Sequence, residues 1–208
     1  MSFQTIFEIQ QSMTVNNRRM VGQQVARSGY ITVAQYLTSV PWVFTVVPHN
    51  YLYYPDAREI IQTIDNKDRQ LPETIIFDSS NLAWFTEYQG DVLSPSFTLA
   101  STPTPNTQTL SMNVGSGTGY AFRAGDFCMI AGFTYKVTAD VLRDTGTVNV
   151  PIHRPLIGSP TSGATVDVGN DCTFTVVAES CPIYTLTPMT NGAFVNWDGA
   201  FVFREYIT

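Results

Sequence analysis

The stretch from Phe3 to Val47 combines strand-forming sequence with a single acidic side chain, Glu8, and this combination most constrains the fold. No Asp or Glu lies between Ile9 and Pro55. Two segments rich in β-branched and aromatic residues, 3–15 and 30–47, flank a polar insert that contains three arginines: Arg18, Arg19 and Arg27. Such segments favour extended backbone. We therefore expect a long β-hairpin or strand pair whose edges are completed by neighbouring subunits.

Alternation of apolar and polar residues supports a half-buried first strand. Phe3, Phe7 and Met13 fall at odd positions among polar neighbours, although Ile6 and Gln11 interrupt the pattern. This period of two is typical of a strand with one buried face. Residues 42–47 are apolar on both faces, which indicates a short strand buried on both sides.

One helix is predicted over residues 56–69. Asp56 precedes Glu59 by three residues, the pattern of a capping box in which Asp56 is the N-cap. Ile60, Ile61 and Ile64 form an apolar stripe along the same stretch. A further strand is expected at 74–77.

The remainder of the chain predicts a second β domain. Residues 81–109 are rich in Ser, Thr, Pro and Gly and read as a linker, which gives a first domain at 1–80 and a second at 110–208. Apolar runs at intervals of about ten residues are typical of a barrel or sandwich. The predicted strands are 110–114, 120–122, 127–130, 134–139, 147–151, 165–168, 172–177 and 183–187, and a last strand contains Phe201 and Phe203.

This plan resembles the tail-tube fold of tube, distal-tail and baseplate proteins of long-tailed, contractile bacteriophages. The resemblance rests on NNRRMVGQQVARSGYIT, PWVFTV, DAREIIQTID and AFRAGDFCMIAGFTYKVT. It implies a mainly β chain in which a small tail-tube-like β-barrel with a long hairpin and one helix precedes a second β-barrel or sandwich. It also implies a virion protein, assembled in the host cytoplasm into a ring of copies, hexameric in such tails, that contacts other tail or baseplate proteins.

Charge constrains the partners. The chain has 208 residues and a formal charge of −6, yet only 13% of its residues are charged. Residues 1–55 carry three arginines and one acid, whereas the rest carries 16 acids and eight bases. An acidic protein does not hold phosphates by counterion release. DNA is therefore expected to pass nearby without being gripped, and the low charge suggests a surface covered by partners; a soluble surface rich in Ser, Thr and Asn is the alternative.

No cofactor, metal site or membrane span is expected. Cys128, Cys172 and Cys181 lack the spacing of a zinc or redox motif and read as buried free thiols. No apolar run approaches the ~20 residues that cross a bilayer. The sequence also lacks the pattern of a signal peptide.

No constellation of catalytic residues emerges, so we expect no enzyme. The loop 115–119 contains three glycines but lacks the Lys and helix of a phosphate-binding loop, which favours a turn. His49 and His153 have no nearby ligand cluster. Two carboxylate pairs, Glu87 with Asp91 and Asp140 with Asp144, could serve glycoside cleavage, although turn acids of this kind are common. Asp126 is predicted to cap a turn.

The candidate site is therefore an assembly interface. It comprises the arginines and the aromatic residues near them: Arg18, Arg19, Arg27, Trp42, Tyr51, Tyr53 and Tyr54. The arginines are expected to form ion pairs with acidic surfaces of adjacent copies; contact with nucleic acid in a channel and a solvated loop are the alternatives. A receptor- or glycan-binding module is favoured instead if Trp42, Trp84 and Trp197 share one exposed groove, and a cell-wall hydrolase is the third possibility.

Overall fold

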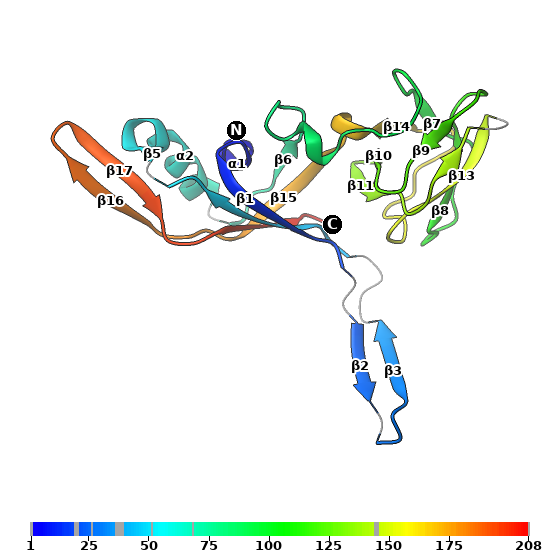
Figure 1. Ribbon diagram of the computed structural model, residues 1–208, viewed down its shortest axis with the longest axis horizontal. Coiled ribbons are helices and arrows are strands. Elements are labelled where there is room, and N and C mark those ends of the chain that lie inside the picture. The colour runs from blue at the N-terminus through cyan, green and yellow to red at the C-terminus, as the bar shows by residue number, and fades with distance from the viewer. Residues whose placement is uncertain are drawn as a thin grey trace. The chain divides into compact units, whose positions relative to one another are not determined.

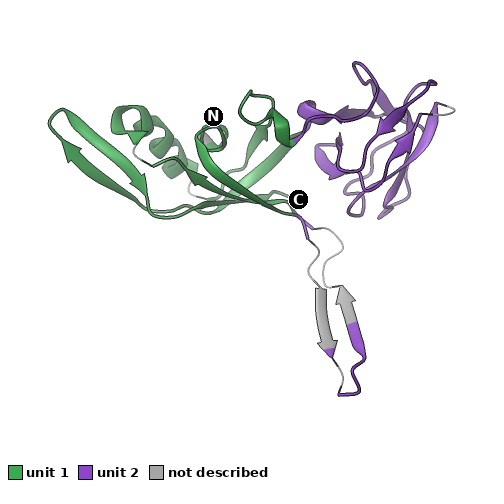
Figure 2. Cartoon of the chain, viewed as in Figure 1, with its two compact units in different colours: residues 1–16, 41–85, 173–208 green, residues 17–40, 86–172 purple. Residues whose placement is uncertain are grey.

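The chain is mainly β-structure and divides into two compact units (Figures 1 and 2). The computed structural model describes residues 2–18, 21–25, 27–35, 40–50, 52–67, 69–143 and 146–207. Unit 1 comprises residues 1–16, 41–85 and 173–208, and unit 2 comprises residues 17–40 and 86–172. Each unit is therefore assembled from segments that are far apart in the sequence.

Unit 1 is built on a five-stranded antiparallel sheet of strand order β1-β4-β18-β15-β6. Its strands are β1 (Gln10–Asn16), β4 (Val43–Pro48), β6 (Glu73–Ile76), β15 (Thr173–Ser180) and β18 (Phe201–Glu205). Two helices, α1 (Ser2–Glu8) and α2 (Tyr54–Lys67), and the 3-10 turn η1 (Ala83–Phe85) belong to the same unit. Aromatic side chains form its core: Phe44 lies 5.2 Å from Phe174 between ring centroids, and Phe7 lies 5.1 Å from Phe203.

The strand predicted over 3–15 is wrong for its first part, because residues 2–8 form helix α1. Phe3, Ile6 and Phe7 are almost fully buried, and their spacing of three and four residues places them on one helical face. Gln4 fixes the helix against β6, because its amide group donates to the carbonyl of Ile76 and accepts from the N–H of Ile76, both at 2.9 Å. Phe3 and Phe7 fit both a period of two and a helical spacing, whereas Ile6 fits the helical spacing only.

The expected pairing of the two arms is confirmed for residues 10–16 and 43–48. β1 pairs with β4 in antiparallel register from Gln10 opposite Pro48 to Asn16 opposite Val43. β4 alternates half-buried and buried residues, so one of its faces is more deeply buried than the other. The polar insert contributes β2 (Val21–Val25), which forms a separate hairpin with β3 (Ile31–Gln35) at the beginning of the second arm.

The predicted helix is present but begins at Tyr54 and ends at Lys67. Asp56 consequently lies in the first turn, where its charge suits the helix dipole, and not at the N-cap. Pro55 fits inside this first turn because N–H groups there have no partner within the helix. Ala57, Ile61 and Ile64 form its buried face.

A second sheet of unit 1, with strand order β16-β17-β5, contains the C-terminal hairpin. Its strands are β5 (Leu52–Tyr53), β16 (Tyr184–Met189) and β17 (Gly192–Trp197). Tyr53 supports this hairpin, because its hydroxyl donates to the carbonyl of Asn191 at 3.0 Å. A Cβ atom at Gly192 would lie 2.6 Å from the Tyr53 ring, so the contact requires glycine.

Unit 2 contains a six-stranded antiparallel sheet of order β11-β10-β14-β7-β8-β13. Its elements are β7 (Phe97–Leu99), β8 (Thr109–Asn113), β9 (Tyr120–Phe122), β10 (Phe127–Ile130), β11 (Phe133–Lys136), β12 (Val141–Leu142), β13 (Thr147–Pro151), β14 (Thr165–Val168) and η2 (Gly169–Asp171). Val137 forms a bridge with Ile152, beyond the ends of β11 and β13. The bridge joins the two outer strands, and the curled sheet encloses its own apolar core.

The strand predictions for the second half hold for most segments, including 120–122, 127–130, 147–151 and 165–168. Two features were not expected. The segment read as a linker contains β7 and the beginning of β8. Residues 173–208 belong to unit 1, because β15 pairs with β6 and β18 pairs with β4.

Candidate assembly surface

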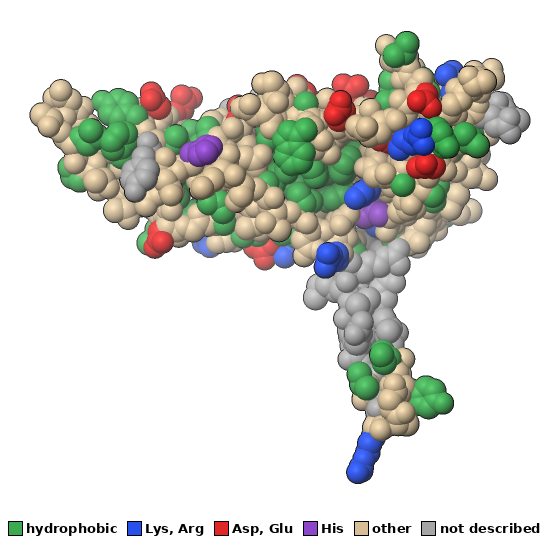
Figure 3. Space-filling view, viewed as in Figure 1, with side chains coloured by type: hydrophobic (Ala, Val, Ile, Leu, Met, Phe, Trp, Pro, Cys, Tyr) green, Lys and Arg blue, Asp and Glu red, His purple; other side chains and the backbone are tan. Residues whose placement is uncertain are grey.

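The β2–β3 hairpin ends in an exposed tip that combines apolar side chains with a cation. Val25, Tyr30 and Ile31 are each more than 60% exposed, and Arg27 is exposed in the turn between the strands. Figure 3 shows hydrophobic and basic side chains at this tip and no acidic one on the face drawn. Exposed apolar residues that form a contiguous patch mark interaction sites. We call Val25, Arg27, Tyr30 and Ile31 the hairpin tip.

The root of the hairpin is fixed to unit 2 by a buried arginine. Arg154 is 0% exposed, and its guanidinium donates to the carbonyl of Val40 at 2.7 Å and to the carbonyl of Thr134 at 2.9 Å. The same group lies 5.1 Å from the centroid of the Tyr135 ring. Because the guanidinium fork is planar and rigid, the bond to Thr134 orients the group whose other bond holds the chain at Val40.

Strand β16 exposes all six of its residues and forms the end of its sheet. Asp198 donates its N–H to the carbonyl of Ile183 at 2.9 Å, and the register continues without a shift along β16 and β17. Hydrogen-bonded pairs alternate along an antiparallel ladder. Thr185 and Thr187 therefore direct their backbone groups toward β17, whereas Tyr184, Leu186 and Pro188 direct theirs outward.

The position of Pro188 agrees with this register. Proline has no N–H and is tolerated at an edge position whose amide would face solvent. The outward edge therefore offers the N–H and C=O of Tyr184 and Leu186 and the C=O of Pro188. Among the residues that the structure describes, no strand pairs with this edge. An extended segment from another molecule can add to it by backbone hydrogen bonding.

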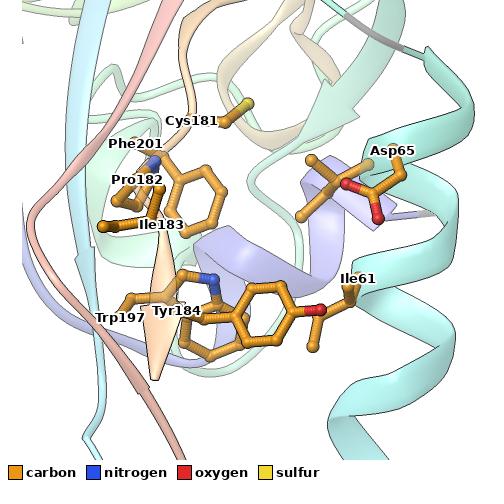
Figure 4. Close-up of a pocket in the computed structure, with 9 residues that line it drawn as sticks. Ile61, Asp65, Cys181, Pro182, Ile183, Tyr184, Trp197 and Phe201 are labelled. Atoms are coloured by element: carbon orange, nitrogen blue, oxygen red, sulfur yellow. The ribbon is translucent and has the colours of Figure 1, made fainter. Parts of the chain in front are cut away.

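An apolar pocket of about 350 Å³ lies beside the same strand (Figure 4). Tyr184 and its cross-strand partner Trp197 form one wall, and Ile61 and Asp65 of α2 lie opposite. The remaining lining comes from Ile64, Cys181, Pro182, Ile183 and Phe201. Asp65 is exposed, so the pocket combines an apolar interior with one carboxylate. We call this pocket together with the outward edge of β16 the β16 groove.

The two units differ in how their charges are distributed. Unit 1 contains ten acidic and four basic residues, a formal charge of −6. The segment 17–40 contains three arginines and no acid, a formal charge of +3. The hairpin tip and the β16 groove are thus complementary in both charge and polarity.

The residues predicted for the assembly interface occupy different environments. Arg18 and Arg27 are exposed, and Arg19 and Tyr51 lie outside the described residues. Trp42 is only 2% exposed and stacks on Phe44 in the core of unit 1. Tyr53 supports the β16–β17 turn from the side and Tyr54 begins α2. The β16 groove was missed, because the alternation of Thr with apolar residues before Pro188 indicates a strand but not which of its edges is paired.

Two of the acids considered for glycoside cleavage, Asp91 and Asp140, have structural roles, and Glu87 is exposed. Asp91 accepts a hydrogen bond from the N–H of Tyr120 at 2.7 Å, and Asp140 accepts from the N–H of Ala124 at 2.8 Å and pairs with Arg123. Asp144 lies outside the described residues. Asp126 caps the predicted turn, since its two oxygens accept from the N–H groups of Arg123 and Gln89.

The remaining chemical candidates also have structural partners. The glycine-rich loop contacts the side chain of Arg143, whose Nε donates to the carbonyl of Gly115 at 3.0 Å. His153 accepts a hydrogen bond from the N–H of Lys136 through Nδ1, at 3.0 Å. Burial raises the pKa of the Cys128 thiol to about 12 and raises that of Cys172 as well, so both stay protonated at neutral pH.

Within the described ranges, no three His, Cys, Asp or Glu side chains come together as metal ligands. No helix in those ranges has the length and apolar character needed to cross a bilayer. No protein-family model matches the sequence, and a comparison with curated proteins finds no similar chain.

Proposed function

We propose that this protein is a structural subunit of a bacteriophage tail, in the tail tube, the tube–baseplate junction or the baseplate, and that copies of it assemble into a ring. The observation that carries the proposal is the complementarity between the hairpin tip and the β16 groove. The tip is apolar and basic, and the groove is apolar and carries Asp65. Both lie on the surface of one chain, so one copy can donate the tip and the next can accept it.

The contact joins two different surfaces, which is the requirement for a head-to-tail interface. Interfaces of this kind generate closed rings when the rotation between copies closes. A two-fold contact would instead join a surface to itself. The tip contains no acidic residue that would repel the groove, and unit 1 carries an excess of acids that attracts it.

The mode of contact follows from the backbone of β16. Tyr184 and Leu186 present unpaired N–H and C=O groups at the edge, and one strand of the incoming hairpin can bond to them. Tyr30 and Ile31 then pack into the apolar pocket, and Arg27 forms an ion pair with Asp65. Assembly removes an exposed strand edge, which stabilises the ring and protects it from uncontrolled aggregation.

A charge exchange tests this proposal. Arg27→Asp and Asp65→Arg should each weaken assembly, because each places like charges in contact, and the double variant should recover it. Light scattering coupled to size exclusion measures the mass of the assemblies, and circular dichroism checks the fold. Lys136→Asp applies the same charge change to an exposed residue of unit 2 and serves as the control. A wild-type chain that stays monomeric at all concentrations would contradict the ring proposal. A double variant that assembles no better than the single variants would contradict the contact between Arg27 and Asp65.

A further inference from the structure

A second groove of unit 1 is centred on the exposed tryptophan of η1. Trp84 is 62% exposed, yet its ring is held in place because Nε1 donates to the carbonyl of Asn81 at 2.8 Å. Its indole also packs edge-on against Phe85, with centroids 6.0 Å apart, and Phe85 lies 4.9 Å from the core ring of Phe77. The indole is therefore anchored to the core while much of its surface faces outward.

The groove beside this indole has a volume of about 390 Å³ and is polar. Besides Trp84 its lining comprises Glu8, Gln10, Gln11, Ser12, Met13, His49 and Asn81. These side chains offer amide and hydroxyl donors together with amide, hydroxyl and carboxylate acceptors. Among the described residues that line the groove there is no lysine or arginine, and Glu8 contributes a carboxylate. An anionic ligand such as a phosphate is therefore disfavoured.

A β-bulge shapes one side of the groove. The register between β1 and β4 shifts between Gln10 and Ser12, so Gln11 has no partner opposite it. Bulges of this type change the direction of side chains and occur frequently beside functional sites. The bulge lies at the outer strand of the main sheet. Three consecutive polar side chains consequently line the same groove.

One buried polar atom in this lining lacks a partner. Oε1 of Gln10 is shielded from solvent and accepts no hydrogen bond from the residues that the structure describes. A buried acceptor without a donor is costly and calls for an explanation. A ligand hydroxyl can supply the missing donor once the Gln10 side chain turns into the groove that it lines.

We propose that this groove binds a neutral saccharide of one or two pyranose units. A pyranose presents an apolar C–H face, which suits the indole of Trp84, and a rim of hydroxyl groups that both donate and accept hydrogen bonds. The groove provides a rigid aromatic surface with convergent polar groups beside it, the usual composition of a small-ligand site. This inference does not depend on ring assembly, since every lining residue belongs to unit 1 of a single chain. It gives a structural subunit a means of holding a glycan.

Tryptophan fluorescence provides the test. Trp42 and Trp197 are 2% and 6% exposed, so quenching by aqueous iodide reports mainly on Trp84. The full-length chain is titrated with a panel of neutral saccharides: maltose, lactose, cellobiose and di-N-acetylchitobiose. We expect at least one to protect Trp84 from iodide with a Kd near or below about 1 mM. Trp84→Ala should weaken binding at least about tenfold, measured by calorimetry, whereas Trp84→Phe should retain most of it.

Two further variants distinguish saccharide binding in this groove from non-specific effects of mutation. Gln10→Ala removes the unpartnered acceptor and should lower the affinity several-fold without lowering the unfolding midpoint. Tyr206→Ala removes another exposed aromatic side chain of unit 1 and should leave the affinity unchanged. Absence of binding by every saccharide in the panel overturns the proposal. So does a Trp84→Ala variant that binds normally, or one whose defect lies in assembly alone, which would assign the groove to a protein partner.

Discussion

At the scale of single residues, Glu73 connects the first helix to the sheet and makes stability depend on acid. Its carboxylate lies 2.6 Å from Nζ of Lys67 and accepts a hydrogen bond from the N–H of Phe3 at 3.3 Å. Desolvation pushes the pKa of Glu73 upward, but the hydrogen bonds and the charge of Lys67 outweigh it and hold the pKa below 4.5. The ionised Glu73 carboxylate therefore contributes its full stabilisation above pH 4.5. This contribution is lost as the pH falls through the lower pKa of the folded state.

Glu73→Gln should lower the free energy of unfolding by about 1–3 kcal/mol near neutral pH, because the bonds to a charged group are lost. The difference from the wild type should shrink as the pH falls through the lowered pKa of the folded state, where the wild-type carboxylate also becomes protonated. Urea unfolding at a series of pH values measures both effects. A constant difference across the series would mean that the ionised carboxylate contributes nothing.

Arg154 offers a second test at this scale. Arg154→Met keeps much of the apolar stem but leaves the carbonyls of Val40 and Thr134 without their donor. An unsatisfied buried acceptor costs about 1–3 kcal/mol. We expect a loss of stability in this range for each acceptor that water does not reach, together with faster hydrogen exchange at the hairpin root. Arg154→Lys should be intermediate, because a single ammonium group does not reproduce the fork. Equal stability of all three proteins would contradict this role.

At the scale of elements, the outward edge of β16 predicts a specific response to proline. Leu186→Pro removes an outward N–H and leaves the ladder to β17 intact, so assembly should weaken while the monomer stays folded. Thr187→Pro removes an N–H that bonds to β17 and should destabilise the hairpin itself. Size exclusion measures the first effect and thermal unfolding the second. If Leu186→Pro assembles normally, the edge of β16 is not the acceptor.

Sequence patterns predict elements well where the burial is regular, and they fail where one pattern fits two structures. The strands at 120–122 and 127–130 were found because turn residues bound short apolar runs. Helix α1 was missed because Phe3 and Phe7 fit an alternating strand as well as a helical face. The exposure of Arg27 follows from its polar surroundings, whereas the free edge of β16 depends on which strands pair. Pairing of this kind is long-range and leaves no local signature.

At the scale of the whole molecule, unit 1 is a single domain interrupted by two insertions. The hairpin segment enters after β1 and returns to β4, where Asn16 lies opposite Val43. The segment 86–172 enters after η1 and returns to β15, and its ends are adjacent because Thr86 Oγ1 donates to Asn170 Oδ1 at 2.9 Å. Insertions whose ends meet are tolerated by the host domain. This explains why contiguous boundaries at 80 and 110 do not describe the two compact units.

The inserted segment 86–172 should therefore fold when it is expressed alone. Its apolar core draws on residues between Phe97 and Val168, and bonds beyond β11 and β13 connect the outer strands of its sheet. The isolated segment loses the bond between Arg154 and Val40, so it should unfold at a lower urea concentration than the same unit in the full chain. Conversely, a chain in which a short Gly-Ser linker replaces 86–172 should keep the sheet of unit 1, because β6, β15, β18 and β4 pair with one another directly. Circular dichroism and cooperative unfolding measure both outcomes. An isolated segment that lacks a cooperative transition would show that its core depends on the rest of the chain.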